Sequence, residues 1–81
     1  MEALDVLRSA MEEAGKGGYE LSRDMGRAPS YVGAALGRGS VPKADTLAAM
    51  LSPCGYVLAA VPRDQVPAAA LVIDAPASLR A

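Results

Sequence analysis

The 81-residue sequence contains no histidine, phenylalanine or tryptophan, and Cys54 is its single cysteine. Without histidine, the chain lacks a principal zinc ligand and the side chain most often used for acid–base catalysis. One cysteine excludes a disulfide within the chain and a cysteine-rich metal site. We therefore expect no metal, no cofactor and no enzymatic activity, and we interpret Cys54 as a small packing residue.

Long apolar runs are also missing. The apolar stretches near the C-terminus are interrupted by Pro62-Arg63-Asp64-Gln65, so none approaches the roughly 20 residues that a membrane helix needs. The start, Met-Glu-Ala-Leu-Asp, is acidic and lacks the basic-then-apolar order of a secretory signal. We expect a cytoplasmic protein with no membrane association. Its single small core must be built mainly from Leu, Val, Met and Ala.

The charges are sorted along the chain, although the net charge is only −1. Residues 1–14 carry four acidic residues against one arginine, which gives −3. Residues 15–43 carry five basic residues against two acidic ones, which gives +3, and the remainder carries −1. A weakly acidic chain therefore has a basic middle third, which indicates an anionic partner.

The spacing of apolar residues predicts four helices, at about 2–14, 19–25, 29–37 and 43–52. Glycine and proline mark their ends. Gly26 ends the second helix, and Pro29 suits the first turn of the third because its missing N–H would be unpaired there in any case. Gly37 and Gly39 are expected to end that third helix.

The C-terminal part changes character. Two short apolar runs, 56–61 and 70–73, flank the stretch from Pro62 to Pro67. Apolar runs on either side of a polar turn predict a β-hairpin, with the prolines at strand ends.

The second and third predicted helices together form a recognisable motif. Two helices joined by a turn of about three or four residues that contains glycine are a helix-turn-helix. Gly26 would allow a positive φ in that turn, where a side chain would be strained. Ser22 is small where the two helices approach each other closely.

The stretch LSRDMGRAPSYVGAALGRGSVPKADTLAAMLSPCGY resembles the XRE-type helix-turn-helix family, that of phage Cro and repressor proteins. The matching features are Leu21-Ser22, Met25-Gly26, Val32, the Gly39 loop with Pro42, Thr46-Leu47 and Gly55-Tyr56. The resemblance covers roughly residues 3–60, and the GYVLAAVP…ALVID segment is similar to the β-extension of some small members. It implies a domain that binds operator DNA, usually as a dimer.

The expected fold is therefore mainly α: a four- or five-helix helix-turn-helix domain with a short C-terminal β-hairpin. We divide the chain into a DNA-binding domain at 1–55, a β-hairpin dimerisation extension at 56–74 and a flexible tail at 75–81.

The sequence departs from the family at the positions that would read bases. In the family these side chains project from the exposed face of the second helix of the motif. Here Ser30 alone offers a hydrogen bond, and no Gln, Asn or Arg is present for bidentate base contacts. Gly33 has no local structural need, so we interpret it as a point of close approach to DNA or another surface. The positions concerned are Ala28, Pro29, Ser30, Gly33, Ala34 and Gly37.

The candidate DNA-binding residues lie on or beside this third predicted helix. Arg27 and Arg38 flank it, and Lys43 begins the next helix at a place that lies near a phosphate in the family. Tyr31 is either half-buried core or a phosphate contact, and Arg23 either faces DNA or pairs with neighbouring carboxylates. The full candidate set is Arg27, Ser30, Tyr31, Gly33, Ala34, Arg38 and Lys43.

These observations lead to two functional hypotheses. The first is a sequence-specific DNA-binding transcriptional regulator, a homodimeric repressor of phage or mobile-element type, with double-stranded DNA as its partner. The alternative is a protein-interaction module on a helix-turn-helix scaffold, such as an antitoxin or a phage-encoded inhibitor. The basic middle third favours DNA, whereas the bare third helix and the acidic whole favour a protein partner.

Overall fold

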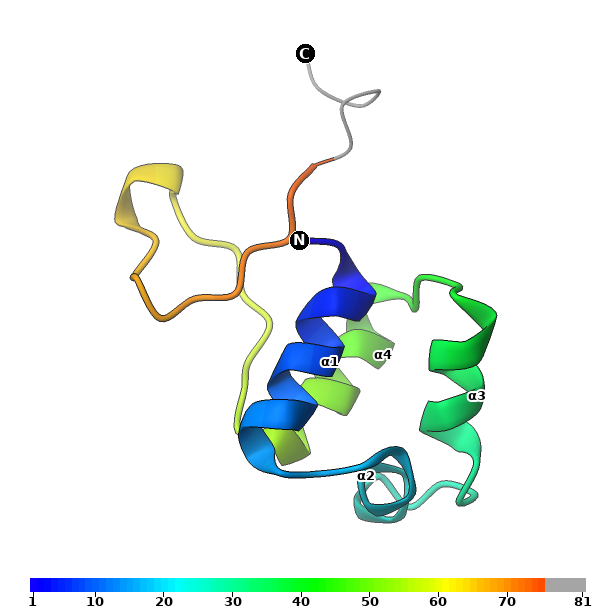
Figure 1. The fold of residues 1–81 in the computed structure, drawn as a ribbon. Helices are drawn as coiled ribbons and strands as arrows, with labels where there is room; N and C mark the ends of the chain where they lie inside the picture. Colours follow the sequence, from blue (N-terminus) through cyan, green and yellow to red (C-terminus); the bar gives the residue numbers. More distant parts are fainter. Residues whose placement is uncertain (76–81) are drawn as a thin grey trace.

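The computed structural model describes residues 1–75, and α-helices are the main secondary structure among them (Figure 1). Every predicted helix is confirmed within two residues at each end. The predicted tail at 75–81 lies outside the described residues except for Ala75. The elements in chain order are α1 (Ala3–Ala14), α2 (Gly18–Asp24), α3 (Tyr31–Arg38), α4 (Ala44–Leu51) and the 3₁₀ turns η1 (Ser52–Cys54) and η2 (Arg63–Gln65).

Helix α1 begins and ends where its sequence supplies partners for the free backbone groups. The Glu2 N–H donates to the Asp5 carboxylate at 3.1 Å, beside the positive end of the helix dipole. At the other end Gly15 adopts a φ of 68°, and its N–H bonds to the Glu12 carbonyl at 3.1 Å. Glycine takes this left-handed conformation without the strain that a Cβ would cause.

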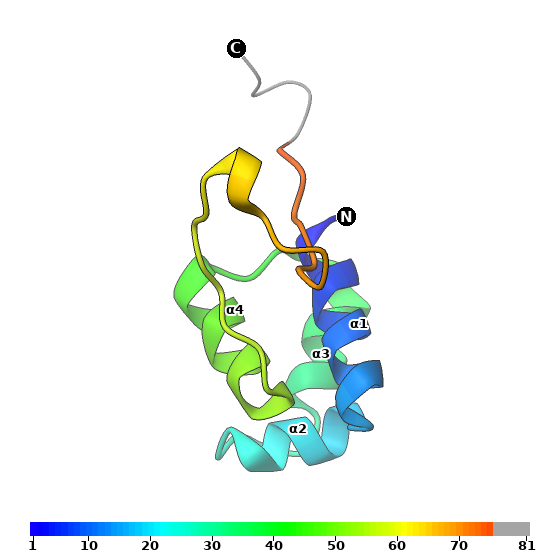
Figure 2. The same ribbon diagram turned by 90° about the vertical axis from the view of Figure 1, so that its left-hand side faces the viewer.

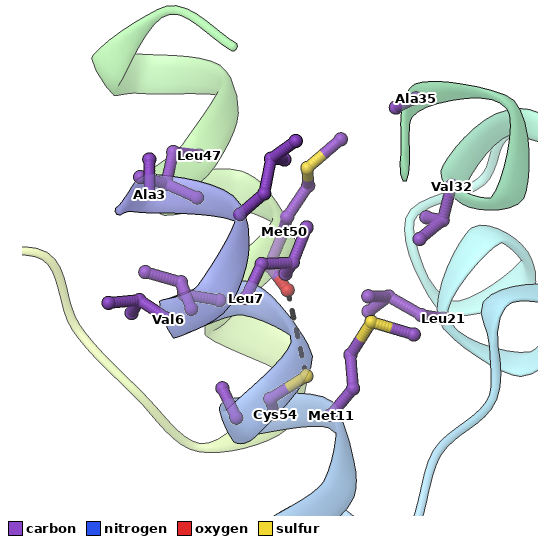
Figure 3. Packing of buried hydrophobic residues seen from close by; sticks show 13 residues of the cluster. Ala3, Val6, Leu7, Met11, Leu21, Val32, Ala35, Leu47, Met50 and Cys54 are labelled. Atoms are coloured by element: carbon purple, nitrogen blue, oxygen red, sulfur yellow. Dashed lines mark hydrogen bonds between the residues drawn. The ribbon is translucent and has the colours of Figure 1, made fainter. Parts of the chain in front are cut away.

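The core lies between the four helices (Figure 3). Helix α1 packs on α4, and α2 packs on α3. Cys54 is buried among the apolar side chains, as predicted, and its Sγ lies 3.8 Å from the Met50 carbonyl oxygen. The buried apolar residues are Ala3, Leu4, Val6, Leu7, Ala10, Met11, Leu21, Val32, Ala35, Leu47, Met50, Leu51 and Cys54.

The connection between α2 and α3 is longer than predicted. It covers residues 25–30, and Gly26 has the predicted positive φ, at 70°. Pro29 lies in this connection rather than in the first turn of α3, because the helix begins only at Tyr31. Its other end also differs: α3 continues through Gly37, and the left-handed turn that ends it falls on Gly39.

Beyond η1, the chain runs outward, turns at η2 and returns to the start of α1, where the Asp74 N–H donates to the Met1 carbonyl at 3.0 Å. No β-strand is assigned within residues 1–75, so the predicted strand pairing is not seen there. Figures 1 and 2 place this segment on the side of α1 and α4 that faces away from α3.

No helix among residues 1–75 is long and apolar enough to cross a membrane.

Candidate nucleic-acid interface

The N-terminus of α3 is held by a buried serine from α2. Ser22 is completely buried, its hydroxyl donates to the Gly18 carbonyl at 2.7 Å, and it accepts the Val32 N–H at 3.0 Å. The first N–H groups of a helix have no partner within the helix, so an acceptor from elsewhere stabilises them. Ser22 therefore caps α3 from the neighbouring helix. The sequence predicted its small size at this crossing but not its hydrogen bond.

Gly18 makes the second close contact between the two helices. The second helix was predicted to begin at residue 19, just after Gly18, whereas Gly18 is the first residue of α2. A Cβ at Gly18 would lie 3.4 Å from the Gly33 nitrogen and 3.7 Å from the Gly33 Cα. A methyl group would thus just touch the backbone of α3, and a longer side chain would push α3 away. The available signal was the four-residue spacing of Gly18 and Ser22, which puts two small residues on one helix face.

The outer face of α3 carries almost no side-chain bulk. Ser30, Gly33, Ala34 and Gly37 are all exposed. A Cβ at Gly33 would have no neighbour within 4 Å, so nothing in the chain itself requires glycine there. This agrees with the expectation that Gly33 has no local structural need. The face is smooth, and a second surface could approach the helix backbone closely.

Arg27 is positioned at the N-terminal end of α3 by Tyr31. The guanidinium carbon lies 5.2 Å from the centre of the Tyr31 ring, a cation–π distance. Tyr31 is half-buried and packs against the core, which fixes the ring under the exposed arginine. Of the two roles considered for Tyr31, the packing role is therefore observed, and a contact of its hydroxyl with a phosphate stays a prediction.

The remaining cations of the candidate set are also exposed. Arg38 lies in the last turn of α3, and Lys43 is the N-cap residue immediately before α4. Within the part of the chain that the structure describes, Arg27, Arg38 and Lys43 form no ion pair with a carboxylate. Their charges are therefore available to an anionic partner.

Other basic residues of the middle third are neutralised locally. The Lys16 ammonium lies 2.5 Å from the Asp24 carboxylate. This hydrogen bond raises the pKa of Lys16 above its ordinary value and lowers that of Asp24. Arg23 lies 4.0 Å from Glu20 and 3.9 Å from Asp24, so the pairing considered for it is observed. The Lys16–Asp24 pair links the connection before α2 to the last residue of that helix.

One further arginine near α3 escaped sequence analysis. Arg8 on α1 is exposed, and its guanidinium lies 3.5 Å from the Leu36 carbonyl oxygen in the last turn of α3. A cation is favourable there because the C-terminal end of a helix carries partial negative charge. No local pattern could have revealed it, since the two residues are 28 positions apart.

Exposed cations therefore surround α3 within the part of the chain that the structure describes. Within residues 1–75, no three His, Cys, Asp or Glu side chains gather as potential metal ligands. Burial raises the pKa of the Cys54 thiol, which keeps it protonated and unreactive. Comparisons with known proteins give no match to a family model, to a curated protein or to a solved structure.

Proposed function

We propose that the chain is a sequence-specific DNA-binding transcriptional regulator, a homodimeric repressor of phage or mobile-element type. The observation that carries the proposal is the presentation of α3. Ser22 and Gly18 fix this helix from behind, its outer face is open, and Arg27, Arg38 and Lys43 surround it with charges that no carboxylate neutralises. The resemblance to XRE-type helix-turn-helix proteins supports the same function.

In this proposal α3 enters the major groove, and the cations around it contact phosphates. Ser30 supplies one hydrogen-bonding side chain, and Ala34 can lie against a thymine methyl group. The rest of the specificity comes from groove shape and bridging water, which a smooth helix can follow closely. Tyr31 contributes its hydroxyl to a phosphate.

The segment at 56–74 serves as the dimerisation extension. Two copies related by a twofold axis would carry two α3 helices, one for each half-site of an operator. The proposal includes the predicted β-hairpin, in which the runs 56–61 and 70–73 would pair as strands in the dimer.

A gel-shift experiment tests the proposal. Purified protein is titrated into the DNA upstream of its own gene and into an unrelated duplex of equal length, at fixed salt. We expect preferential binding, which the double variant Arg27→Ala/Arg38→Ala weakens. The single variants Arg27→Ala and Arg38→Ala are compared with Arg23→Ala, which removes the same charge from an arginine that already lies beside Glu20 and Asp24. Equal binding to both duplexes, or equal loss in the control, would refute the proposal.

The bare face of α3 supports a second candidate, a protein-interaction module of the antitoxin or inhibitor type. Gly33, Ala34 and Gly37 would let a partner helix approach as closely as a DNA backbone would. A chain that binds no duplex, yet loses a protein partner when Gly33 is replaced by a bulky residue, would favour this function over the first.

A further inference from the structure

An apolar hollow of about 580 Å³ lies between the C-terminal segment and the body of the protein. Its inner wall is formed by Val6 of α1 and Leu51 of α4, which belong to the core. Its outer wall comes from both arms of the segment, including Val57, Val66 and Ile73. The hollow is therefore continuous with the apolar core and remains open on its outer side.

The segment also holds most of the exposed large apolar side chains of the described chain. Val57 is 84% exposed, Val72 46% and Ile73 40%. The helical domain has few comparable side chains, of which Val41 at 71% is the most exposed. Apolar side chains gathered on one side of a small protein mark an interaction surface.

The backbone of the segment is open as well. In the part of the chain that the structure describes, the amides of residues 57–61 and 71–73 donate no hydrogen bond. Unpaired amides and carbonyls next to an apolar surface can accept a segment from another chain by main-chain pairing.

The charges of the C-terminal segment indicate that the partner is a second copy of the same chain. Arg63 and Asp64 are the only charged residues between Tyr56 and Ile73, and both are exposed on η2 at the outer turn. Neither forms an ion pair within the described residues. Adjacent single charges of opposite sign complement a copy of themselves across a twofold axis, because each arginine can face the other copy's aspartate.

We infer that a second copy of this chain covers the hollow, with Arg63 of each copy facing Asp64 of the other. This deepens the proposed function, because it names the surface and the register of the dimer. The covered surface lies across α1 and α4 from α3 (Figure 2), so both α3 faces stay open when the dimer forms. The dimer surface is tested on the protein alone, without DNA. The sedimentation test can therefore fail while the gel shift succeeds, and the gel shift can fail while the sedimentation test succeeds.

Sedimentation equilibrium of the full chain tests the surface. We expect a dimer at tens of micromolar for the wild type and a monomer for Val57→Asp, which puts a charge into the apolar interface. Val41→Asp is the matched control, since it makes the same change at a similarly exposed valine outside the segment. Unchanged helical circular dichroism verifies that the variants fold. A wild type that sediments as a monomer, or a dimeric Val57→Asp, would overturn the inference and leave the hollow to an apolar ligand or another protein.

Charge reversal tests the register. Arg63→Asp and Asp64→Arg each create two like-charge contacts across the axis, and we expect each variant alone to dimerise roughly tenfold more weakly at low salt. An equimolar mixture restores both attractive contacts, so a heterodimer of near wild-type affinity should form. Variants that dimerise as tightly as the wild type, or a mixture that restores nothing, would show that the register is wrong.

Discussion

Replacing Ser22 by alanine should destabilise the protein through one hydrogen bond to α3. The hydroxyl accepts the Val32 N–H at 3.0 Å in a site with no solvent access, because both residues are completely buried. Alanine keeps the small volume that the helix crossing needs but removes this acceptor. Water cannot replace it without separating α2 from α3.

The size of the effect follows from three contributions. A buried N–H left without a partner costs about 1–3 kcal/mol. The better helix propensity of alanine returns about 0.5 kcal/mol, and the cavity left by one oxygen atom is small. We therefore expect a loss of about 1–2 kcal/mol in the free energy of unfolding. In a domain of this size that lowers Tm by roughly 5–15 °C.

Urea unfolding followed by circular dichroism measures the loss, with Ser40→Ala as the control. Ser40 is exposed in the loop between α3 and α4, so its replacement should change stability by less than about 0.5 kcal/mol. Hydrogen exchange adds a local readout, because the Val32 amide should lose protection in Ser22→Ala. A Ser22→Ala protein as stable as the control, with Val32 still protected, would refute the capping role.

Three further predictions concern the proposed DNA interface and the ion pair between Lys16 and Asp24. Lys43→Ala should reduce the slope of log affinity against log salt by about 1 if Lys43 contacts a phosphate, and an unchanged slope would remove it from the interface. Gly33→Ala should stabilise the fold by up to about 1 kcal/mol, because its methyl group meets nothing within 4 Å, yet weaken DNA binding if α3 lies tightly in a groove; equal affinity would refute the crowding. Asp24→Asn should lower Tm at neutral pH, because Lys16 holds the pKa of Asp24 below its usual 3.8. That difference should vanish as acid protonates Asp24 in the wild type, and also above the raised pKa of Lys16, so a difference that persists at the lowest pH would refute the pairing.

The helices could be predicted because their signals are local. Apolar residues recur at helical spacing, and the glycines at 15, 26 and 39 each adopt the positive φ that a chain reversal requires. The start of α3 was placed wrongly because proline is acceptable both in a first helical turn and in the loop before one. In the structure the helix begins at Tyr31, where Tyr31 packs against the core and Val32 is buried in it.

The contacts that fix α3 could not be predicted because they join residues distant in the sequence. The bond from Val32 to Ser22, the contact of Gly18 with Gly33, and the approach of Arg8 to Leu36 all depend on how the helices are oriented. The candidate cations were easier to find, since exposure is the ordinary state of arginine and lysine. Which of them are neutralised depended again on tertiary structure, as Lys16 and Asp24 show.

The bare face of α3 and the apolar C-terminal segment are complementary parts of the proposed function. Phosphate contacts from Arg27, Arg38 and Lys43 would supply affinity for any DNA, because phosphates carry no sequence information. In the proposed complex one exposed hydroxyl, that of Ser30, would discriminate only weakly between bases. A dimer would double these few contacts and add a requirement that none of them can impose alone, namely that two half-sites lie at a fixed spacing on the DNA. For a chain with this α3, selectivity would therefore depend on the segment at 56–74 as much as on the helix that touches the bases.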